Sequence, residues 1–204
     1  MRRSEATRFS GQHRVACARP WPLAAGLGLC VSLILLAASL LAQQRPTDYQ
    51  VKAAYLYNFG KFVQWPANPS TQKDSLFSVC VLGQDPFGPA LDATLSGASI
   101  GGQRVVARRI SSPEESVNCR ILFLGATEAA RMNKIIQSLD KEAVLTVSDL
   151  PEFSQRGGMI QFVTEGNRVR FEVNLEAAQQ AGLTLSSELL KVATTVRRNS
   201  TRKD

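Results

Sequence analysis

The most informative absence in this 204-residue chain is that of histidine. The single histidine, His13, lies within the first 42 residues, which have the composition of an export signal. The rest of the chain has no imidazole, and this excludes Ser-His-Asp and Cys-His nucleophile arrangements and nearly every zinc site. It also removes the usual general base near neutral pH. We therefore expect a protein that is not an enzyme, without catalytic residues, metal or cofactor.

The first 42 residues predict export from the cytoplasm. Five arginines precede Leu23–Leu41, a run of 19 residues without charge, and Ala42 then offers a small residue for cleavage. We interpret residues 1–42 as a signal peptide. The alternative is an uncleaved anchor, because 19 apolar residues approach the length of a membrane span. Under both interpretations the chain after Gln43 is exported, and we expect a periplasmic protein.

The charge balance changes once this leader is set aside. The body keeps 19 basic and 16 acidic residues, a net charge of +3, and several of the bases crowd the end of the chain. A nucleic-acid-binding protein needs a basic face on its fold, so we expect no nucleic-acid partner. Residues 198–204 are interpreted as a solvated basic tail.

Only two cysteines, Cys80 and Cys119, remain outside the leader. Each lies in or beside a predicted strand, and in an exported chain this pattern indicates one disulfide. In the chain-entropy model such a bridge contributes on the order of 3–4 kcal/mol. Two buried free thiols are the alternative.

The body begins with a predicted helix from Tyr49 to about Gln64. Thr47 and Gln50 have the spacing of a capping box, and Trp65-Pro66 is expected to end the helix. Helical spacing predicts a core-facing stripe of Val51, Tyr55, Phe59 and Phe62. Because the segment has more aromatic residues than one face can bury, part of it is available for a partner or ligand. The aromatic residues are Tyr49, Tyr55, Tyr57, Phe59, Phe62 and Trp65.

Strands then alternate with helices, which predicts an α/β fold with a mixed, mostly parallel sheet flanked by helices. Asp85 is expected to cap a helix that extends to Leu95, and Thr127 a helix with four apolar residues at helical spacing. The predicted strands are Leu76–Leu82, Gln103–Ile110, Arg120–Leu124 and Ala143–Val147, and the apolar residues of the second helix are Met132, Ile135, Ile136 and Leu139.

The C-terminal part predicts an antiparallel hairpin and two short helices. Met159–Val163 and Arg168–Val173 pair across Thr164–Asn167. Asn174 is expected to cap a helix that ends at Gly182, and Ser186 to open a last one that extends to Arg197-Arg198. In that last helix the expected buried residues are Leu189, Leu190, Val192, Ala193 and Val196. We find no interior linker, so residues 47–197 are interpreted as a single domain.

Candidate functional residues gather in the stretch Leu145–Asn174. Asp85 and Asp149 follow predicted strands, and open α/β sheets bind ligands beyond the carboxyl ends of their strands. We expect Asp85 to cap its helix and Asp149 to hold its own loop through backbone amides. A carboxylate enzyme is the alternative, although no pair of carboxylates has the spacing for hydrolysis. Gly157-Gly158 requires a backbone explanation and does not by itself indicate catalysis.

Several ordered motifs resemble the YfiR-like family over essentially all of residues 49–196. They are YQVKAAYLYNFGKFVQWP at Tyr49–Pro66, VCVLGQDPFG at Val79–Gly88, LTVSD at Leu145–Asp149, GGMI at Gly157–Ile160 and RFEVN at Arg170–Asn174, together with Leu183–Lys191. The resemblance implies a single-domain α/β protein of the periplasm without enzymatic activity. It also implies that Cys80 and Cys119 form the family's disulfide. Where some members carry a second cysteine pair, this chain has Ser154 and Gln161, so switching through a second bridge is not open to it.

The resemblance further implies partners. The family's namesake represses a membrane diguanylate cyclase by binding its periplasmic region, an outer-membrane lipoprotein sequesters it, and it forms a homodimer. We therefore expect a regulator, acting in cyclic di-GMP signalling, that binds the periplasmic domain of a membrane cyclase or histidine kinase. A periplasmic small-molecule-binding module, with its pocket near Asp149 and the aromatic helix, is the second hypothesis. The candidate binding residues are Tyr57, Lys61, Trp65, Asp149 and Phe153, and the candidate structural residues are Gly157, Gly158 and Asn174.

Overall fold

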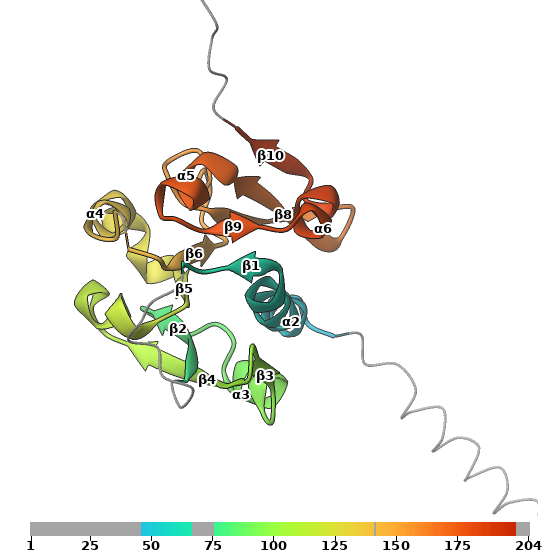
Figure 1. Ribbon diagram of the computed structural model, residues 1–204. Helices are drawn as coiled ribbons and strands as arrows, with labels where there is room; N and C mark the ends of the chain where they lie inside the picture. The colour runs from blue at the N-terminus through green and yellow to red at the C-terminus, as the bar shows by residue number, and fades with distance from the viewer. Residues whose placement is uncertain (1–45, 67–75, 141, 199–204) are drawn as a thin grey trace, which may run out of the picture. The chain divides into compact units, whose positions relative to one another are not determined.

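The computed structural model describes residues 46–66, 76–140 and 142–198, so the predicted leader and most of the basic tail lie outside it. These residues form an α/β domain around an eight-stranded sheet of order β10-β8-β7-β6-β5-β2-β4-β3 (Figure 1). The predicted fold class is confirmed. In the part of the chain that the structure describes, no helix has the length and apolar character needed to cross a membrane.

The middle of the sheet is parallel and the antiparallel pairs lie toward its ends. The parallel strands are β2 (Phe77–Leu82), β4 (Gln103–Ile110), β5 (Ile121–Leu124) and β6 (Leu145–Ser148). Two further strands also pair in parallel, β7 (Ile160–Glu165) with β6 and β10 (Thr195–Arg197) with β8 (Arg168–Asn174). The antiparallel pairs are β7 with β8 and β3 (Ser99–Ile100) with β4. Strand β1 (Val63–Gln64) pairs with β9 (Thr184–Leu185) in a separate two-stranded sheet. Every residue of β2, β5 and β6 is buried, as expected of strands covered on both faces.

Helices cover both faces of the sheet and enclose two hydrophobic cores. The larger core lies under α2 (Asp48–Phe62), α3 (Pro89–Leu95), α5 (Leu175–Gln180) and α6 (Ser187–Val192). The smaller core, on the other face, includes the disulfide and α4 (Met132–Ser138). Two 3-10 helices complete the element order, η1 (Pro113–Asn118) and η2 (Ala126–Arg131). The disulfide Cys80–Cys119 is formed, and both cysteines are buried.

Helix α2 begins as predicted but presents a different face to the core. Its capping box is present, with the Thr47 side chain accepting from the Gln50 amide. The buried residues are Lys52, Ala53, Leu56, Phe59 and Gly60, so the predicted stripe was wrong at Phe62, which is 39% exposed. Gly60 explains the rotation, because a Cβ at this position would lie 2.5 Å from Ile100 and the helix approaches the sheet closely there. The helix ends at Phe62 because Val63 and Gln64 pair with β9.

Two predicted helix starts were also wrong. Asp85 does not cap a helix: its carboxylate accepts from the Phe87 amide at 2.7 Å and from Arg109 Nε at 2.8 Å, and α3 begins later, at Pro89. Thr127 lies inside η2, where its hydroxyl accepts a hydrogen bond from the Gln84 amide. In both places, the side chain that local propensity assigns to a helix cap makes a tertiary contact instead.

The C-terminal hairpin is confirmed, with a turn shorter than expected. Gly166 and Asn167, both at positive φ, connect β7 to β8 directly, as in a two-residue hairpin turn. The side chains of Asn174 and Ser186 cap α5 and α6 as predicted.

The last helix, however, ends at Val192 and not at the predicted Arg197-Arg198. The chain becomes extended at Ala193, and the Thr194 amide donates to Phe171 O at 2.9 Å. Residues Thr195–Arg197 then form β10 alongside β8, so Val196 belongs to a strand. Val192, predicted to be buried, is 59% exposed.

Candidate functional site

The usual ligand position of an open α/β sheet is filled by the protein itself. The chain runs from β2 to β4 on one side and then to β5 on the other, so the topological switch point lies between β2 and β5. There the Gly125 amide donates to Leu82 O at 2.9 Å, and the Gln84 amide donates to Thr127 Oγ1 at 3.1 Å. A Cβ on Gly83 would lie 2.6 Å from the carboxylate of Glu128, which is 3% exposed and paired with Arg131. A buried carboxylate here disfavours phosphate and other anionic ligands.

Asp149, at the end of β6, connects this strand to helix α2. Its Oδ2 accepts hydrogen bonds from Lys52 Nζ at 2.7 Å and from Tyr49 Oη at 2.9 Å. The loop itself is held by Ser148, whose hydroxyl accepts from the Leu150 amide and donates to Leu124 O. Asp149 therefore anchors the end of β6 to helix α2. The neighbouring Ser148 makes the loop contacts that were expected of Asp149.

This anchor changes the acidity of Tyr49. Burial, and then the hydrogen bond to the Asp149 carboxylate, raise the pKa of Tyr49 to about 12. The ammonium of Lys52 lies 4.3 Å from the centroid of the Tyr49 ring, within cation–π distance. At neutral pH the Tyr49 phenol therefore keeps its proton and donates a hydrogen bond to Asp149. The contact is structural, and Tyr49 does not act as a general base.

The other candidate binding residues do not meet Asp149 in one place. On α2 the Lys61 ammonium lies 4.3 Å from the ring centroid of half-buried Tyr57. Trp65 packs edge-on against Phe77, with its indole N–H buried. Phe153 is fully buried and serves packing. The structure thus distributes these side chains over α2, the segment after β1 and the loop after β6.

The double glycine and Asn174 shape the connection into β7. Gly158 lies against the Phe153 ring, so closely that an added Cβ would overlap the ring. Asn174 accepts from the Ala177 amide as the cap of α5 and donates through Nδ2 to Ser154 O at 2.9 Å. Gly157 has a φ of +99°, a left-handed conformation that favours glycine. These residues define the course of the backbone.

Hydrogen bonds link Ser154 to the β7–β8 hairpin. The Ser154 amide donates to Gln161 Oε1 at 3.0 Å, and the Ser154 hydroxyl donates to Glu172 Oε2 at 2.9 Å. Both links cross from the loop to the β7–β8 hairpin. They give that loop a reversible, non-covalent attachment to the sheet.

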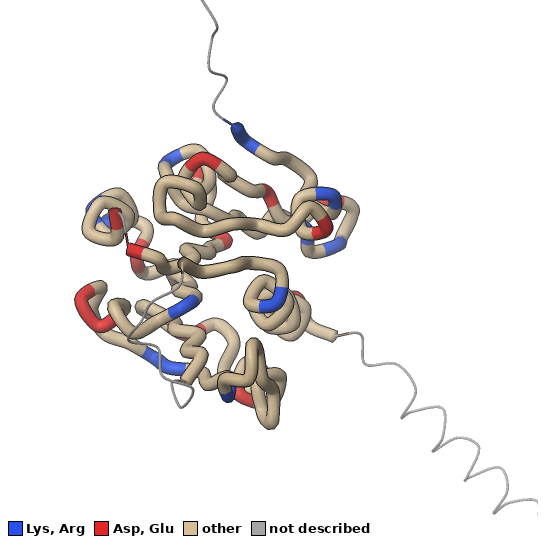
Figure 2. The backbone as a smooth tube through the Cα atoms, viewed as in Figure 1, with Lys and Arg blue, Asp and Glu red and all other residues tan. Residues whose placement is uncertain are grey.

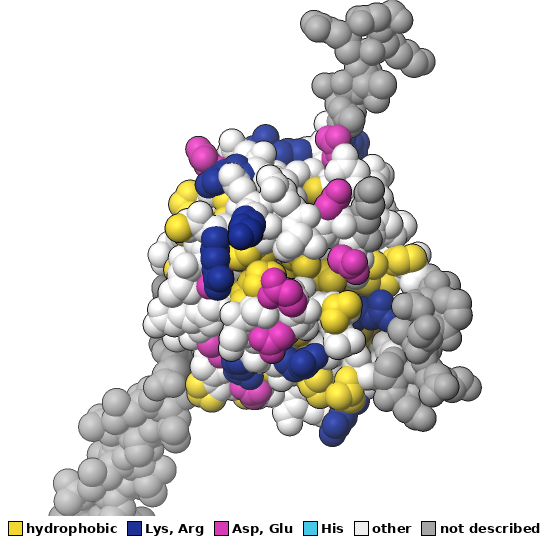
Figure 3. Space-filling view, turned by 90° about the vertical axis from the view of Figure 1, so that its left-hand side faces the viewer, with side chains coloured by type: hydrophobic (Ala, Val, Ile, Leu, Met, Phe, Trp, Pro, Cys, Tyr) yellow, Lys and Arg dark blue, Asp and Glu magenta, His cyan; other side chains and the backbone are white. Residues whose placement is uncertain are grey.

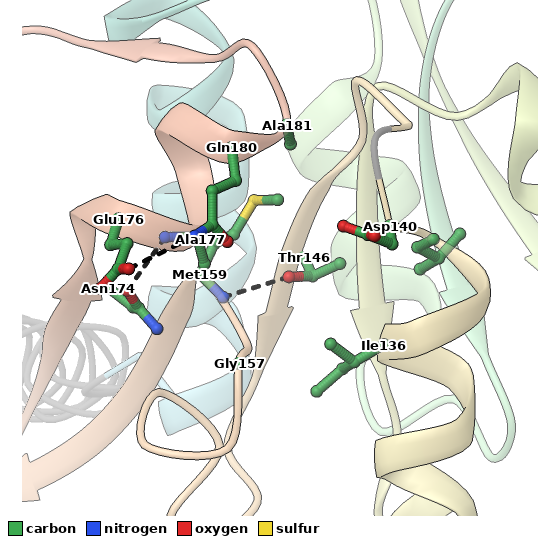
Figure 4. A pocket seen from close by; sticks show the side chains of 11 residues that line it. Ile136, Asp140, Thr146, Gly157, Met159, Asn174, Glu176, Ala177, Gln180 and Ala181 are labelled. Carbon is green, nitrogen blue, oxygen red and sulfur yellow. Dashed lines mark hydrogen bonds between the residues drawn. The ribbon is translucent and has the colours of Figure 1, made fainter.

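A cavity of about 190 Å³ lies between α4 and α5 (Figure 4). Its walls include the apolar side chains of Ile136, Leu139 and Met159, and polar groups come from Asp140 and Gln180. The Thr146 hydroxyl, which also lines it, accepts from the Met159 amide. On the molecular face that carries α4, patches of apolar side chains lie among charges of both signs (Figure 3).

A larger and more apolar groove of about 330 Å³ lies between α2 and α6. Phe59 and Phe171, both fully buried, belong to its lining, and exposed Phe62 and Val192 border it from the two helices. Leu189 adds to the apolar surface, and Asn58 and Glu188 are its polar groups. The sequence prediction missed this groove because it placed Phe62 and Val192 in the core; the excess of aromatic residues in α2 was the signal that pointed to it.

The described ranges contain no group of three or more His, Cys, Asp or Glu side chains that is arranged to hold a metal ion. Asp149 does not belong to the lining of either of these two cavities. The geometry offers an apolar groove and a smaller mixed cavity.

Comparison with known proteins identifies the family. The model of the YfiR/HmsC-like family matches residues 49–194. The ABC domain in complex with L-Trp from Streptococcus pneumonia is 13% identical, with a TM-score of 0.50 over 71% of this chain and 60% of that one, which shows a related fold only. A conserved domain protein from Vibrio cholerae O1 is also 13% identical, with a TM-score of 0.45 over 59% of this chain and 54% of that one. This chain therefore spans little more than half the length of these two solved chains.

The family match has functional meaning because the family is regulatory and non-catalytic. Regulation of diguanylate cyclase signalling and interaction with membrane signalling proteins are properties of this family. A buried disulfide agrees with an oxidising compartment. The match extends from helix α2 past the end of α6 and stops just before β10, and the chain belongs to the YfiR/HmsC-like family.

Proposed function

We propose that this chain is an exported, non-enzymatic regulatory protein that binds the periplasmic region of a membrane diguanylate cyclase or histidine kinase and restrains its output. Family membership supports the regulatory role. The filled switch point supports the absence of an enzymatic reaction, because Thr127 and Glu128 take the space where an open α/β sheet ordinarily holds its ligand.

The observation that carries the proposal is the apolar groove between α2 and α6. Of the four large apolar side chains that are exposed in the described ranges, Phe62 and Val192 border this one groove. Exposed apolar surface with a hollow at its centre is typical of protein–protein contacts, in which a bulky side chain of the partner enters the hollow. A volume of about 330 Å³ accommodates such an anchor residue.

Binding restrains a receptor only when the regulator distinguishes between the receptor's two states. A tenfold shift in the receptor's equilibrium needs about 1.4 kcal/mol of difference in binding free energy. Burial of one additional large apolar side chain in the groove contributes about 1.5–3 kcal/mol, which is enough. We therefore place the anchor residue on a receptor segment that is exposed in the inactive state.

The test uses the paired variant Phe62→Gln/Val192→Gln in a pull-down from solubilised membranes. We expect the native protein to enrich a membrane cyclase or kinase and the variant to lose at least tenfold of that enrichment. Val117→Gln is the matched control, since Val117 is 66% exposed but lies on η1, away from the groove. If the native protein enriches no such receptor, the proposed function is wrong; if the variant still binds, the groove is not the docking surface.

The cavity between α4 and α5 favours a second candidate, a periplasmic small-molecule-binding module. Its mixed lining suits a small amphipathic compound, because such sites pair apolar walls with a few polar groups. A compound that raises the melting temperature of the native protein, but not that of Thr146→Leu, would favour this candidate. A screen without such a compound would leave the receptor proposal unchanged.

Two further parts of the proposal concern assembly. An outer-membrane lipoprotein competes with the receptor, and the regulator forms a homodimer. Light scattering of the purified protein tests the dimer directly. A monomer at micromolar concentration would exclude it, and addition of the lipoprotein to the pull-down tests the competition.

A further inference from the structure

The face of the sheet that carries the smaller core has an unusual group of arginines. Strand register places Cys80 opposite Arg108 and Ser78 opposite Val106, and the Arg120 amide donates to Ser78 O at 2.9 Å on the other side of β2. Because side chains alternate along a strand, Arg104, Arg108 and Arg120 share one face with the buried Cys80. We call these three residues the basic face. Figure 2 shows basic positions along β4, which has no acidic residue.

The arginines of the basic face lack acidic partners in the described part of the chain. Arg108 and Arg120 are half-buried and Arg104 is exposed, and none of the three forms an ion pair with another described residue. Arg109, on the same strand but the opposite face, shows the contrast. It binds Asp85 at 2.8 Å and Asp92 at 2.6 Å. The near-neutral charge of the whole body therefore hides a local excess of positive charge.

The chemistry of these side chains indicates what would bind them. A guanidinium presents a rigid fork of donors that matches a carboxylate in two parallel hydrogen bonds, and the bond is stronger where water is partly excluded. Arg104 and Arg108 lie four residues apart on one strand, which is about 13 Å at the rise of an extended chain. Acidic side chains four residues apart in an extended segment have the same spacing.

We infer that the basic face binds an extended acidic segment of a partner protein. A symmetric contact between two copies of this chain through this surface is disfavoured, because two basic faces repel each other. A membrane is the weaker alternative, because an anionic bilayer attracts exposed lysines as well as arginines and gains little from half-buried ones. The inference does not depend on the groove between α2 and α6.

The experiment measures the fluorescence anisotropy of a labelled 12-residue peptide of Thr and Val with Glu at two positions four residues apart. We expect the full exported body to bind this peptide and not its Gln counterpart, with weaker binding at higher salt. The variant Arg104→Gln/Arg108→Gln/Arg120→Gln should lose at least tenfold in affinity. The control Arg156→Gln/Arg168→Gln/Arg198→Gln removes the same charge elsewhere and should retain the affinity.

Two measurements keep the result interpretable. Arg108→Lys keeps the charge and the fold, and severalfold weaker binding of the peptide by this variant supports the bidentate contact. Vesicles with and without phosphatidylglycerol provide the membrane arm. Binding to the anionic vesicles without binding to the peptide overturns the inference, as does equal loss in the two triple variants or no peptide binding at all. A groove variant, Phe62→Gln/Val192→Gln, should bind the peptide normally, which separates this inference from the proposed docking surface.

Discussion

Lys52 and Asp149, 97 residues apart in the sequence, form an ion pair of 2.7 Å that joins the first turns of α2 to the end of β6. Their side chains are only 11% and 19% exposed. Tyr49 donates to the same carboxylate oxygen from one turn earlier in the helix. Two donors on one helix and one acceptor on the sheet thus define how α2 is positioned, and α2 forms one wall of the apolar groove.

Replacement of Asp149 by Asn should destabilise the protein through Lys52. The substitution leaves a largely buried ammonium without its counter-charge, and such losses cost about 3–5 kcal/mol when burial is complete. Because both side chains keep some exposure to solvent, we expect the free energy of unfolding to fall by roughly 1–3 kcal/mol. Urea denaturation measures this change. Asp48→Asn, on the exposed side of the same helix, is the control, and equal effects in both variants would contradict the anchor.

Tyr49 should titrate late and make the protein less stable at high pH. Its pKa is raised to about 12 from the ordinary 10, so the folded state holds the phenolic proton more tightly than the unfolded state. The resulting stabilisation is complete below pH 10 and is lost as the pH rises toward 12. Denaturation midpoints measured from pH 9 to pH 12 should fall less steeply in Tyr49→Phe than in the native protein. Parallel curves would show that Tyr49 does not contribute.

Local features of the fold were predictable from the sequence because short-range rules govern them. The bounds of β4, the capping residues Thr47, Asn174 and Ser186, and the hairpin were all found from patterns within a few residues. Long-range competition explains the errors. Thr194 bonds to Phe171 and the chain then pairs with β8, which is why the last segment becomes a strand.

The candidate site was predictable only in part. The position of Asp149 at a strand end followed from the sequence, but its partners on α2 did not, because periodicity does not specify which distant side chain meets a carboxylate. The same limit applies to the groove. Helical spacing placed Phe62 and Val192 on the apolar faces of their helices. It does not reveal which part of an apolar helix face the rest of the protein leaves uncovered.

The disulfide between Cys80 and Cys119 should contribute substantially to stability. It closes a loop with a sequence separation of 39 residues, for which the chain-entropy model gives about 3–4 kcal/mol. Cys80→Ala/Cys119→Ala should therefore unfold at clearly lower urea concentration. Since both cysteines are buried, reductant should act on the native protein only as fast as it opens. Rapid reduction under native conditions, followed by thiol labelling, would contradict this expectation.

Gly158 and Phe153 should show strong energetic coupling. A methyl group at position 158 would overlap the Phe153 ring, which is fully buried. Overpacking of this kind costs about 1–3 kcal/mol, so Gly158→Ala should lower the free energy of unfolding by that amount. Gln155→Ala, an exposed change in the same loop, should have little effect.

A double-mutant cycle with Phe153→Leu distinguishes this clash from a general effect of alanine on the loop. The smaller leucine leaves space for the new methyl group, so Gly158→Ala should cost at least 1 kcal/mol less in the Phe153→Leu background than in the native protein. Additive effects would mean that the ring does not set the requirement for glycine. Because the same loop is attached to the β7–β8 hairpin through Ser154, the clash should also loosen that attachment, and hydrogen exchange at the Ser154 amide, which donates to Gln161, should rise in Gly158→Ala alone.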